Sequence, residues 1–276
     1  MLVFGHRGAC GHLPENTMES FELAFEIGAD AIEFDVVITK DGVPVIRHDR
    51  DLTHTTNISQ KSFLSHDVDQ LNLEDVKSLR AIERYPEGRP ESHEHSGRYA
   101  IPTLQEVLDN PNFDGKHLIV DIKYGEPFLE VGLDVAKASA DVIQMSNWKE
   151  RGIKITIECF EFEILESMKK HLGDVADYVF LSAPDMLPAG DSEITNQYLS
   201  KIATEFDGLS VALPMVLSGD LVERTHALGM PIYTYTARVE TAEGEVASWF
   251  RRLIETGVDG IFADQPLELI KVRDAL

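Results

Sequence analysis

Short apolar runs alternate along this chain with longer segments in which apolar residues recur at helical spacing. Apolar runs of this kind, bounded by polar or glycine residues, predict buried strands. We expect eight such strands: Leu2–Gly5, Ala31–Val37, Leu118–Ile122, Ile153–Ile157, Tyr178–Leu181, Gly208–Val211, Ile232–Thr236 and Gly260–Phe262. Between most of them the three-to-four-residue spacing of apolar positions predicts a helix, for example over Val246–Ile254.

The first of these helices has recognisable end signals. Asn16 is expected to cap its start, with Glu19 three positions later as the reciprocal partner, and Gly28 to end it. Eight strands separated by helices over about 250 residues are typical of a (β/α)₈ TIM barrel, an α/β fold. A doubly wound open sheet is the alternative, but it usually has fewer strands and a glycine-rich phosphate loop, which this sequence lacks.

One connection departs from the alternation. The segment from Val37 to Arg47 has Asp41-Gly42 between alternating apolar residues and predicts a hairpin with a two-residue turn. From about residue 49 to residue 100 the chain is polar and irregular. We therefore expect a single barrel domain spanning residues 1–276, with residues 49–100 as a small inserted subdomain at the barrel mouth.

Composition narrows the range of partners. The 276 residues contain 48 Asp and Glu against 25 Lys and Arg, a formal net charge of −23. Such an acidic surface argues against nucleic acid and anionic membranes as partners, so a site for an anionic substrate must be locally positive. No apolar stretch approaches the roughly 18 residues of a membrane span, and no leader pattern precedes Leu2, so we expect a cytoplasmic protein without membrane insertion.

Several predicted strands end in chemically active side chains. His6-Arg7 closes the first run and places a proton-transfer group beside a permanent cation, a pairing that suits a phosphate ester. Glu33 and Asp35 lie two apart on one strand, so both carboxylates point to the same side, about 7 Å apart. Inside a barrel such a pair is costly unless a cation lies between its members, although a solvated strand end is the simpler alternative.

The predicted hairpin adds a second histidine. With Asp41-Gly42 as the two central residues, continuing the ladder places His48 opposite Asp35, at a Cβ separation of roughly 5 Å. A bulge would break this register. A third strand carries Asp121 and Lys123 on one face, where they form either part of the same site or a simple ion pair.

Three carboxylates offer only oxygen ligands, which favours one hard divalent cation, Mg²⁺ or Ca²⁺. Mn²⁺ also fits, especially if a histidine joins the ligands. Two further acidic residues are candidates for the same site. Glu158 follows the fourth predicted strand and is a minor candidate for the barrel mouth, and Glu15 serves either the site or helix-start electrostatics. Cys10 is interpreted as a packing residue.

A series of motifs, in order along nearly the whole chain, resembles the glycerophosphodiester phosphodiesterases. The motifs are His6-Arg7-Gly8, Pro14-Glu15-Asn16-Thr17, Glu33-Phe34-Asp35, Asp41-Gly42 to His48-Asp49, Leu52 to Thr56, Pro102-Thr103-Leu104, Asp121-Ile122-Lys123, and Gly257-Val258-Asp259-Gly260 ending at Asp264-Gln265-Pro266. The resemblance implies a barrel with a subdomain inserted after the second histidine and a divalent metal at the carboxyl ends of the strands. It also implies hydrolysis of glycerophosphodiesters to sn-glycerol 3-phosphate and an alcohol.

The resemblance also implies roles for individual residues. His6 and His48 match the acid/base pair, Arg7 and Lys123 would hold the phosphate, and Tyr235 would form an aromatic wall for the glycerol. Glu33, Asp35 and Asp121 match the metal ligands.

This chain departs from the family pattern at two places. Asp121 stands where the family usually has Glu, so its reach is one methylene shorter. Tyr235-Thr236-Ala237-Arg238 stands in place of Trp-Thr-x-Asn, which bears on the preferred headgroup.

Two other functions are compatible with the same residues. One is a phospholipase C- or D-like phosphodiesterase that acts on lipid headgroups, against which the absence of a basic amphipathic helix argues. The other is a non-catalytic phosphoester-binding barrel, against which the complete set of acid/base and metal positions argues. The partner expected is a small-molecule glycerophosphodiester, and the sequence leaves open whether the protein is a homodimer.

Overall fold

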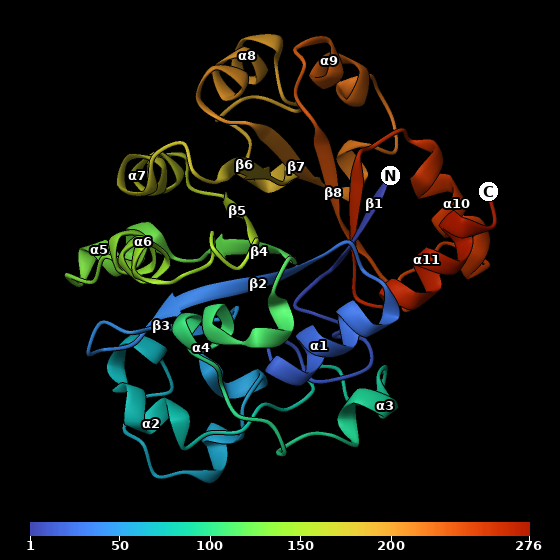
Figure 1. Cartoon of the computed structure of the whole chain (residues 1–276). Helices are drawn as coiled ribbons and strands as arrows, with labels where there is room; N and C mark the ends of the chain where they lie inside the picture. Colours follow the sequence, from blue (N-terminus) through green and yellow to red (C-terminus); the bar gives the residue numbers. More distant parts are fainter.

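The computed structural model describes residues 1–276 and is built around one closed barrel (Figure 1). Its strands are β1 (Leu2–Gly5), β2 (Ala31–Ile38), β3 (Pro44–Ile46), β4 (His117–Ile122), β5 (Lys154–Cys159), β6 (Asp177–Ser182), β7 (Gly208–Ala212), β8 (Ile232–Ala237) and β9 (Gly260–Ala263). Their order in the sheet is β1-β9-β8-β7-β6-β5-β4-β2-β3. All neighbours are parallel except β3, which pairs antiparallel with β2.

The sheet closes because β1 has a parallel neighbour on each side. Val3 is in register with Ile261 of β9, and Phe4 is in register with Ala31 of β2. This closure confirms the predicted (β/α)₈ barrel and rules out the open doubly wound sheet. All eight residues of β2 are buried, as expected for a parallel strand covered on both faces.

Helices surround the barrel on its outside (Figure 1). They are α1 (Met18–Ile27), α4 (Leu104–Asp109), α5 (Gly125–Glu130), α6 (Val135–Met145), α7 (Phe162–Leu172), α8 (Asn196–Glu205), α9 (Leu221–Ala227), α10 (Val246–Glu255) and α11 (Pro266–Asp274). The two remaining helices, α2 (Leu73–Lys77) and α3 (Pro90–His93), lie below the barrel. Single 3₁₀ turns are found at η1 (Leu52–His54), η2 (Asn57–Gln60), η3 (Val68–Gln70), η4 (Pro111–Phe113), η5 (Pro184–Met186) and η6 (Leu213–Met215). No helix combines the length and the apolar character needed to cross a bilayer.

The ends of α1 show one correct and one wrong prediction. Gly28 ends the helix with a φ of 101°, a left-handed conformation that favours glycine. The cap at the start is Thr17, whose hydroxyl accepts a hydrogen bond from the amide of Ser20, and not Asn16. The side chain of Asn16 instead donates to Asp35 at 2.7 Å, because a buried carboxylate offers this amide a stronger partner than a helix end.

The predicted hairpin register is wrong by one residue. Val37 pairs with Val45 and Val36 with Ile46, so the loop holds three residues between Thr39 and Val43. Gly42 takes a φ of 81°, as in a turn followed by a bulge. The ladder ends at Ile46, and His48 therefore lies beyond it and not directly across from Asp35.

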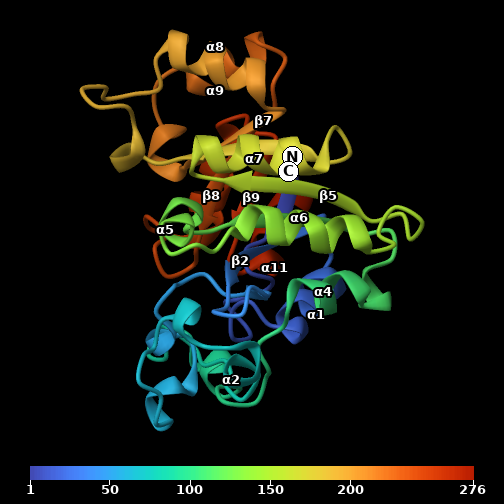
Figure 2. The same ribbon diagram turned by 90° about the vertical axis from the view of Figure 1, so that its left-hand side faces the viewer.

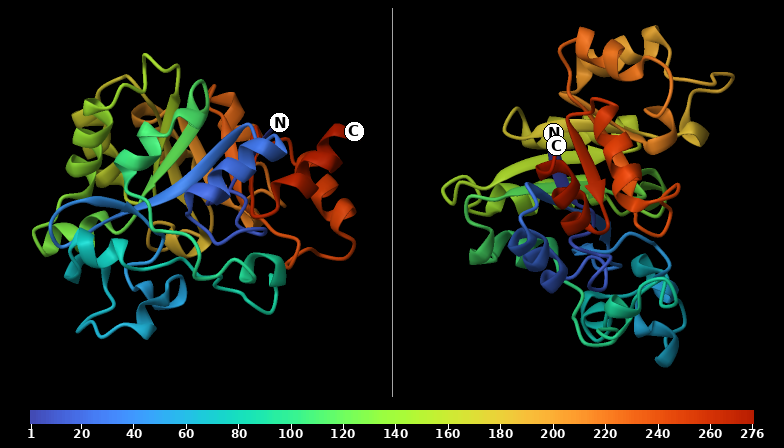
Figure 3. Two further views of the ribbon diagram at one scale, coloured as in Figure 1. Left: turned by 60° about the horizontal axis from the view of Figure 1, so that its bottom comes forward. Right: turned by 90° about the vertical axis from the view of Figure 1, so that its right-hand side faces the viewer.

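The chain between β3 and α4 forms a lobe below the barrel, coloured cyan to green in Figures 2 and 3. It contains only short helical elements, from η1 to α3. Apolar side chains of this lobe, such as Leu52, Ile58 and Val68, are fully buried and belong to the same core as the barrel and its helices. This packing fixes the lobe against the barrel and brings its arginines to the functional site.

A separate small cluster fills the inside of the barrel. It consists of Phe4, Ala31, Ile119 and Phe262, with Tyr235 packed against it. Aromatic rings thus close the barrel interior below the ends of the strands.

Candidate active site

A cavity of about 190 Å³ opens at the carboxyl ends of the barrel strands. Seven of the eight residues proposed from the sequence line it: His6, Arg7, Glu33, His48, Asp121, Lys123 and Tyr235. The eighth, Asp35, is buried beside the cavity and contacts both Arg7 and Lys123. The parallel topology explains this convergence, since every parallel strand of a barrel delivers its last residues to the same end.

Three carboxylates form a compact group in the cavity wall. Ligand oxygens of Glu33, Asp35 and Asp121 lie within 4.8 Å of one another, and all three residues are buried. Asp35 and Asp121 are in direct register on β2 and β4. Oδ1 of Asp121 has no hydrogen-bond partner, and Oδ1 of Asp35 has only the ion-pair contact with Lys123 at 3.2 Å. A buried, all-oxygen donor set with unpartnered atoms fits a hard divalent cation.

Mutual repulsion is evident in the pKa values of this group. Burial, and then the charges of Asp35 and Asp121, raise the pKa of Glu33 well above its usual value. Burial also raises the pKa of Asp121, to about 7, with Asp35 contributing and Lys123 opposing. Burial opposes ionisation of Asp35 too, but Arg7 and Lys123 outweigh it and hold its pKa well below the usual range. A bound cation would relieve this repulsion.

Arg7 contacts two of the three carboxylates, one through its backbone amide and one through its side chain. Its amide donates to Oε2 of Glu33 at 2.8 Å, and its Nε lies 3.1 Å from Oδ2 of Asp35. Nη1 donates to Glu15 at 2.9 Å. A φ of 53° lets the same residue present both groups to the site.

Lys123 provides the second cation. Its Nζ lies 3.2 Å from Oδ1 of Asp35 and also contacts Asp121. The same ammonium lies 4.9 Å from the ring centroid of Phe160, a cation–π distance. Together Arg7 and Lys123 bring two positive charges to the cavity of a protein whose formal net charge is −23.

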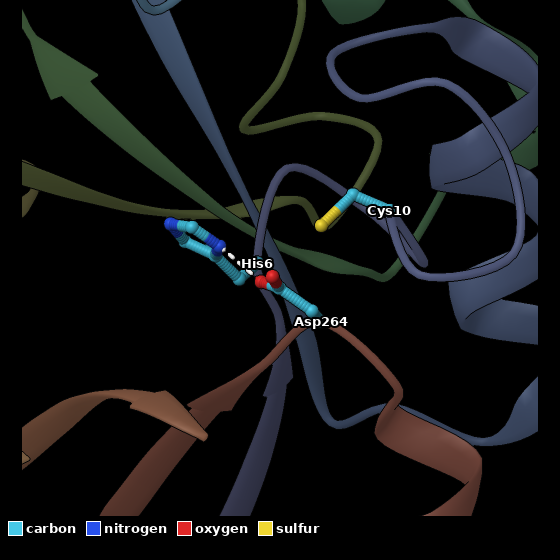
Figure 4. Close-up of side chains that lie close together, drawn as sticks. All are labelled: His6, Cys10 and Asp264. Atoms are coloured by element: carbon cyan, nitrogen blue, oxygen red, sulfur yellow. Dashed lines mark hydrogen bonds and ion pairs between the residues drawn. The ribbon is translucent and has the colours of Figure 1, made fainter. Parts of the chain in front are cut away.

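His6 is bonded to an aspartate that follows the last strand. Its Nδ1 lies 2.6 Å from Oδ1 of Asp264, and Figure 4 shows the ring facing that carboxylate. Burial and the neighbouring Arg7 lower the pKa of His6 to about 4, against the opposing effect of Asp264. The imidazole is therefore neutral at pH 7, with Nδ1 engaged and Nε2 available as a proton acceptor.

Cys10 lies near the same two residues but has no interaction with either of them in Figure 4. Burial raises the pKa of its thiol well above the usual value, which keeps the sulfur protonated. Its packing role remains the best interpretation.

His48 has its own carboxylate partner, which is its neighbour in sequence. Its Nδ1 lies 2.6 Å from Oδ1 of Asp49, and Arg84 binds the other oxygen of Asp49 at 2.8 Å. Burial and Arg7 lower the pKa of His48. Its side chain is 29% exposed, against 11% for His6, so His48 faces the more open part of the cavity.

Arginines from the lobe complete the site, and no sequence pattern predicted them. Arg84 binds both oxygens of Glu15 at 2.7 Å, and Arg89 contacts Asp264. Arg238, after β8, also binds Asp264 at 2.8 Å. The position of Asp264 directly after the last strand was a usable signal, whereas nothing in the irregular segment marked its arginines.

Two further residues shape the cavity. Glu158, a minor candidate from its place after a predicted strand, lines the cavity and is 2% exposed. Tyr235 contributes its ring, packed edge-on against Phe160, while its hydroxyl donates to the carbonyl of Ser182 at 2.7 Å. The Tyr235 hydroxyl is thus already engaged within the protein.

Comparisons with known proteins agree on one family. The family model described as "Glycerophosphoryl diester phosphodiesterase family" matches residues 6–268. The glycerophosphodiester phosphodiesterase of Bacillus subtilis is 29% identical over 276 residues, covering 99% of this chain and 86% of that protein. Its counterpart from Caldanaerobacter subterraneus is 30% identical over 274 residues, covering 98% of this chain and 97% of that protein.

Solved structures share the fold at lower identity. A Silicibacter pomeroyi protein described as a glycerophosphoryl diester phosphodiesterase superposes with a TM-score of 0.79 at 23% identity, covering 100% of this chain and 93% of that one. An Oleispira antarctica phosphodiesterase, solved with the product sn-glycerol-3-phosphate, has a TM-score of 0.78 at 23% identity, covering 99% and 97%. From the family match over nearly its whole length, the chain belongs to the glycerophosphoryl diester phosphodiesterase family.

Proposed function

We propose that this enzyme hydrolyses glycerophosphodiesters, the deacylated forms of phospholipids, to sn-glycerol 3-phosphate and an alcohol, using one divalent cation and two histidines. The proposal rests on one cavity in which three buried carboxylates lie beside the side chains of Arg7 and Lys123. The same cavity holds two histidines, each bonded to its own aspartate. The product found in the Oleispira antarctica relative supports the substrate class.

Glu33, Asp35 and Asp121 are the proposed ligands of the cation, Mg²⁺ or Ca²⁺, with Mn²⁺ as a further candidate. When bound, the cation would stabilise negative charge on the phosphate oxygens. The cation would also balance the charge of the three carboxylates, against which Arg7 and Lys123 supply only two positive charges.

Arg7 and Lys123 are the proposed phosphate-binding residues. Both line the cavity and both are fixed by Asp35, so their positive charges are oriented before the substrate arrives. Tyr235 is the proposed wall for the carbon chain of the glycerol.

The two histidines are proposed to divide the proton transfers. His6 is neutral at pH 7 and is oriented by Asp264, so its Nε2 would accept the proton of the nucleophile. His48 lies nearer the open side and, in its protonated form, would donate a proton to the leaving alcohol oxygen; its lowered pKa makes that form a stronger acid. The nucleophile is either water or the glycerol 2-hydroxyl, and ³¹P NMR detection of a cyclic phosphate distinguishes the two routes.

We also propose that residues 1–276 act as one barrel domain, with residues 49–100 as an insertion at the mouth of the site. The contacts of Arg84 with Glu15 and of Arg89 with Asp264 support this role for the insertion.

The test is an assay of glycerophosphocholine, glycerophosphoethanolamine and glycerophosphoinositol with Mg²⁺, Ca²⁺ or EDTA. We expect metal-dependent release of sn-glycerol 3-phosphate from at least one substrate. Vesicles of intact phospholipid, assayed in parallel, test the phospholipase alternative. Failure to release sn-glycerol 3-phosphate from every diester would contradict the proposal, and binding without turnover would favour the non-catalytic alternative.

A further inference from the structure

Glu158 is a buried carboxyl group to which the proposed mechanism gives no task. It is 2% exposed, lines the cavity, and has an oxygen, Oε1, without a hydrogen-bond partner. The nearby ammonium of Lys123 pairs with Asp35 and Asp121 instead. Since burying an unpaired carboxyl group is costly, an unpartnered one in the wall of a cavity favours a ligand group beside it.

Register places Glu158 directly beside the metal-ligand candidates without making it one of them. Asp121 of β4 and Glu158 of β5 are Cα partners, so both side chains reach the same level of the barrel. The group of oxygens within 4.8 Å of one another comprises Glu33, Asp35 and Asp121 and does not include Glu158. The proposed ligand group is therefore formed without Glu158, and Oε1 of Glu158 keeps no partner within the protein.

The surroundings of Glu158 identify the kind of group. The cavity wall also contains four apolar or aromatic side chains, Phe160, Leu181, Tyr235 and Phe262. Phe262 belongs to the cluster that fills the barrel interior, so its ring lies at the closed floor of the cavity. The hydroxyl of Tyr235 is engaged by Ser182 and offers nothing to a ligand.

An apolar floor with a single free carboxyl group suits a short polyol. Carbon–hydrogen faces pack on the rings, while the carboxyl group accepts a hydrogen bond from a hydroxyl. Every glycerophosphodiester shares the small glycerol unit, whereas its alcohol varies in size. A cavity of about 190 Å³ accommodates the shared unit at the closed floor and leaves the variable alcohol at the mouth.

We propose, resting on the function proposed above, that Glu158 binds a hydroxyl group of the glycerol unit and selects glycerol esters over phosphodiesters of simple alcohols. The residue positions substrate and does not take part in proton transfer. Losing a hydrogen bond to a carboxylate corresponds to roughly a 10- to 100-fold loss in affinity.

The experiment compares two ligands that differ only in hydroxyl groups. The dissociation constants of sn-glycerol 3-phosphate and n-propyl phosphate are measured by calorimetry with saturating Mg²⁺, for wild type, Glu158→Met and Glu158→Gln. Glu163→Met, which removes an exposed carboxylate from the following helix, is the matched control. The Mg²⁺ affinity of each metal-free variant is measured separately.

We expect Glu158→Met to weaken sn-glycerol 3-phosphate by roughly 10- to 100-fold, to change n-propyl phosphate less than about 3-fold, and to leave Mg²⁺ affinity unchanged. Glu158→Gln, which keeps a hydrogen-bonding oxygen, should retain most of the preference. Equal losses for both ligands, or a loss of Mg²⁺ affinity, would assign Glu158 to the metal centre and overturn the proposal. No loss for either ligand would overturn it as well.

Failure of this inference is distinguishable from failure of the proposed function. If the wild type releases sn-glycerol 3-phosphate from a diester while Glu158→Met keeps the wild-type ligand preference, only the role of Glu158 is wrong. If the wild type prefers sn-glycerol 3-phosphate through Glu158 but cleaves no diester, only the proposed reaction is wrong.

Discussion

Nδ1 of His6 lies 2.6 Å from Oδ1 of Asp264, so the residue that follows the first strand is oriented by the residue that follows the last. The contact spans the point at which β1 and β9 close the barrel. Because the bond occupies Nδ1, the remaining nitrogen of the ring is left for the substrate. Closure of the sheet thus also sets the tautomer of the proposed base.

Replacing Asp264 with Asn should lower kcat by roughly 10²- to 10⁴-fold, because the carboxylate that fixes the ring of His6 is lost. The KM should change much less. Steady-state kinetics on the preferred glycerophosphodiester measures both. Glu240→Gln is the control, since it weakens the ion pair of Glu240 with Arg89 without touching His6. Near-normal kcat in Asp264→Asn would remove the aspartate from the mechanism.

The acid limb of the pH profile should be displaced to low pH. Burial and Arg7 lower the pKa of His6 to about 4, so the neutral base is present above that value and lost below it. At saturating Mg²⁺ we expect kcat/KM to show no loss from protonation of His6 until the pH approaches about 4. A pH series of kcat/KM tests this. An acid limb centred at 6.5 or above would show that His6 is not the base.

His117 provides a test of pH-dependent stability away from the carboxylate group. Burial and Lys154 lower its pKa to about 4, and its Nε2 lies 2.9 Å from the hydroxyl of Thr156. His117 binds a proton near pH 6.5 in the unfolded chain but only near pH 4 in the folded protein. The free energy of unfolding is therefore unaffected by this histidine above about pH 6.5 and decreases as the pH falls from 6.5 towards 4. The loss is about 3 kcal/mol at most. Denaturant unfolding of wild type and His117→Gln at pH 7 and pH 4.5 should show a smaller acid-induced loss in the variant, and equal losses would refute the assignment.

Removing the carboxylate of Asp121 should have opposite effects on the stability of the metal-free protein and on the stability gained from Mg²⁺. In the metal-free protein, Asp121→Asn should raise Tm or leave it unchanged, because a repulsive buried charge is lost. Wild type should gain stability on adding Mg²⁺, about 2.7 kcal/mol at a concentration 100 times Kd, and the variant should gain much less. Thermal unfolding with EDTA and with a Mg²⁺ series measures both effects. An equal Mg²⁺ response in the two proteins would exclude Asp121 as a ligand.

Arg84→Ala, a change in the lobe outside the barrel, should lower both the folding stability and kcat. The change leaves Glu15 and Asp49 without their shared cation, at a cost of about 3 kcal/mol for broken buried pairs. Freed from Arg84, Asp49 holds His48 less firmly, so kcat should fall by at least ~10-fold. Arg98→Ala, an exposed arginine of the same lobe, is the control for both urea unfolding and kinetics. Parallel behaviour of the two variants would contradict this role.

The apolar runs of the sequence were sufficient to predict the barrel. Each strand of a closed parallel sheet is covered on both faces, so it appears as a nearly continuous apolar segment, and all eight predicted strands are present with only small differences at their ends. The same topology predicted that the residues at the strand ends meet, because all parallel strands of a barrel end on the same side. Glu33, Asp35 and Asp121 therefore meet as expected.

The tertiary structure decided what depends on partners distant in the sequence. Local rules predicted that Asn16 caps a helix and that a two-residue turn precedes His48. In the fold the side chain of Asn16 donates to the buried carboxylate of Asp35, and the loop before His48 is one residue longer than predicted. The arginines of the lobe left no local pattern, and the strand-end positions of Asp264 and Glu158 did not reveal the partners or the burial that the fold gives them. The physical reason is that the free energy of a buried charge is set by the charges around it, and only the folded chain brings those together.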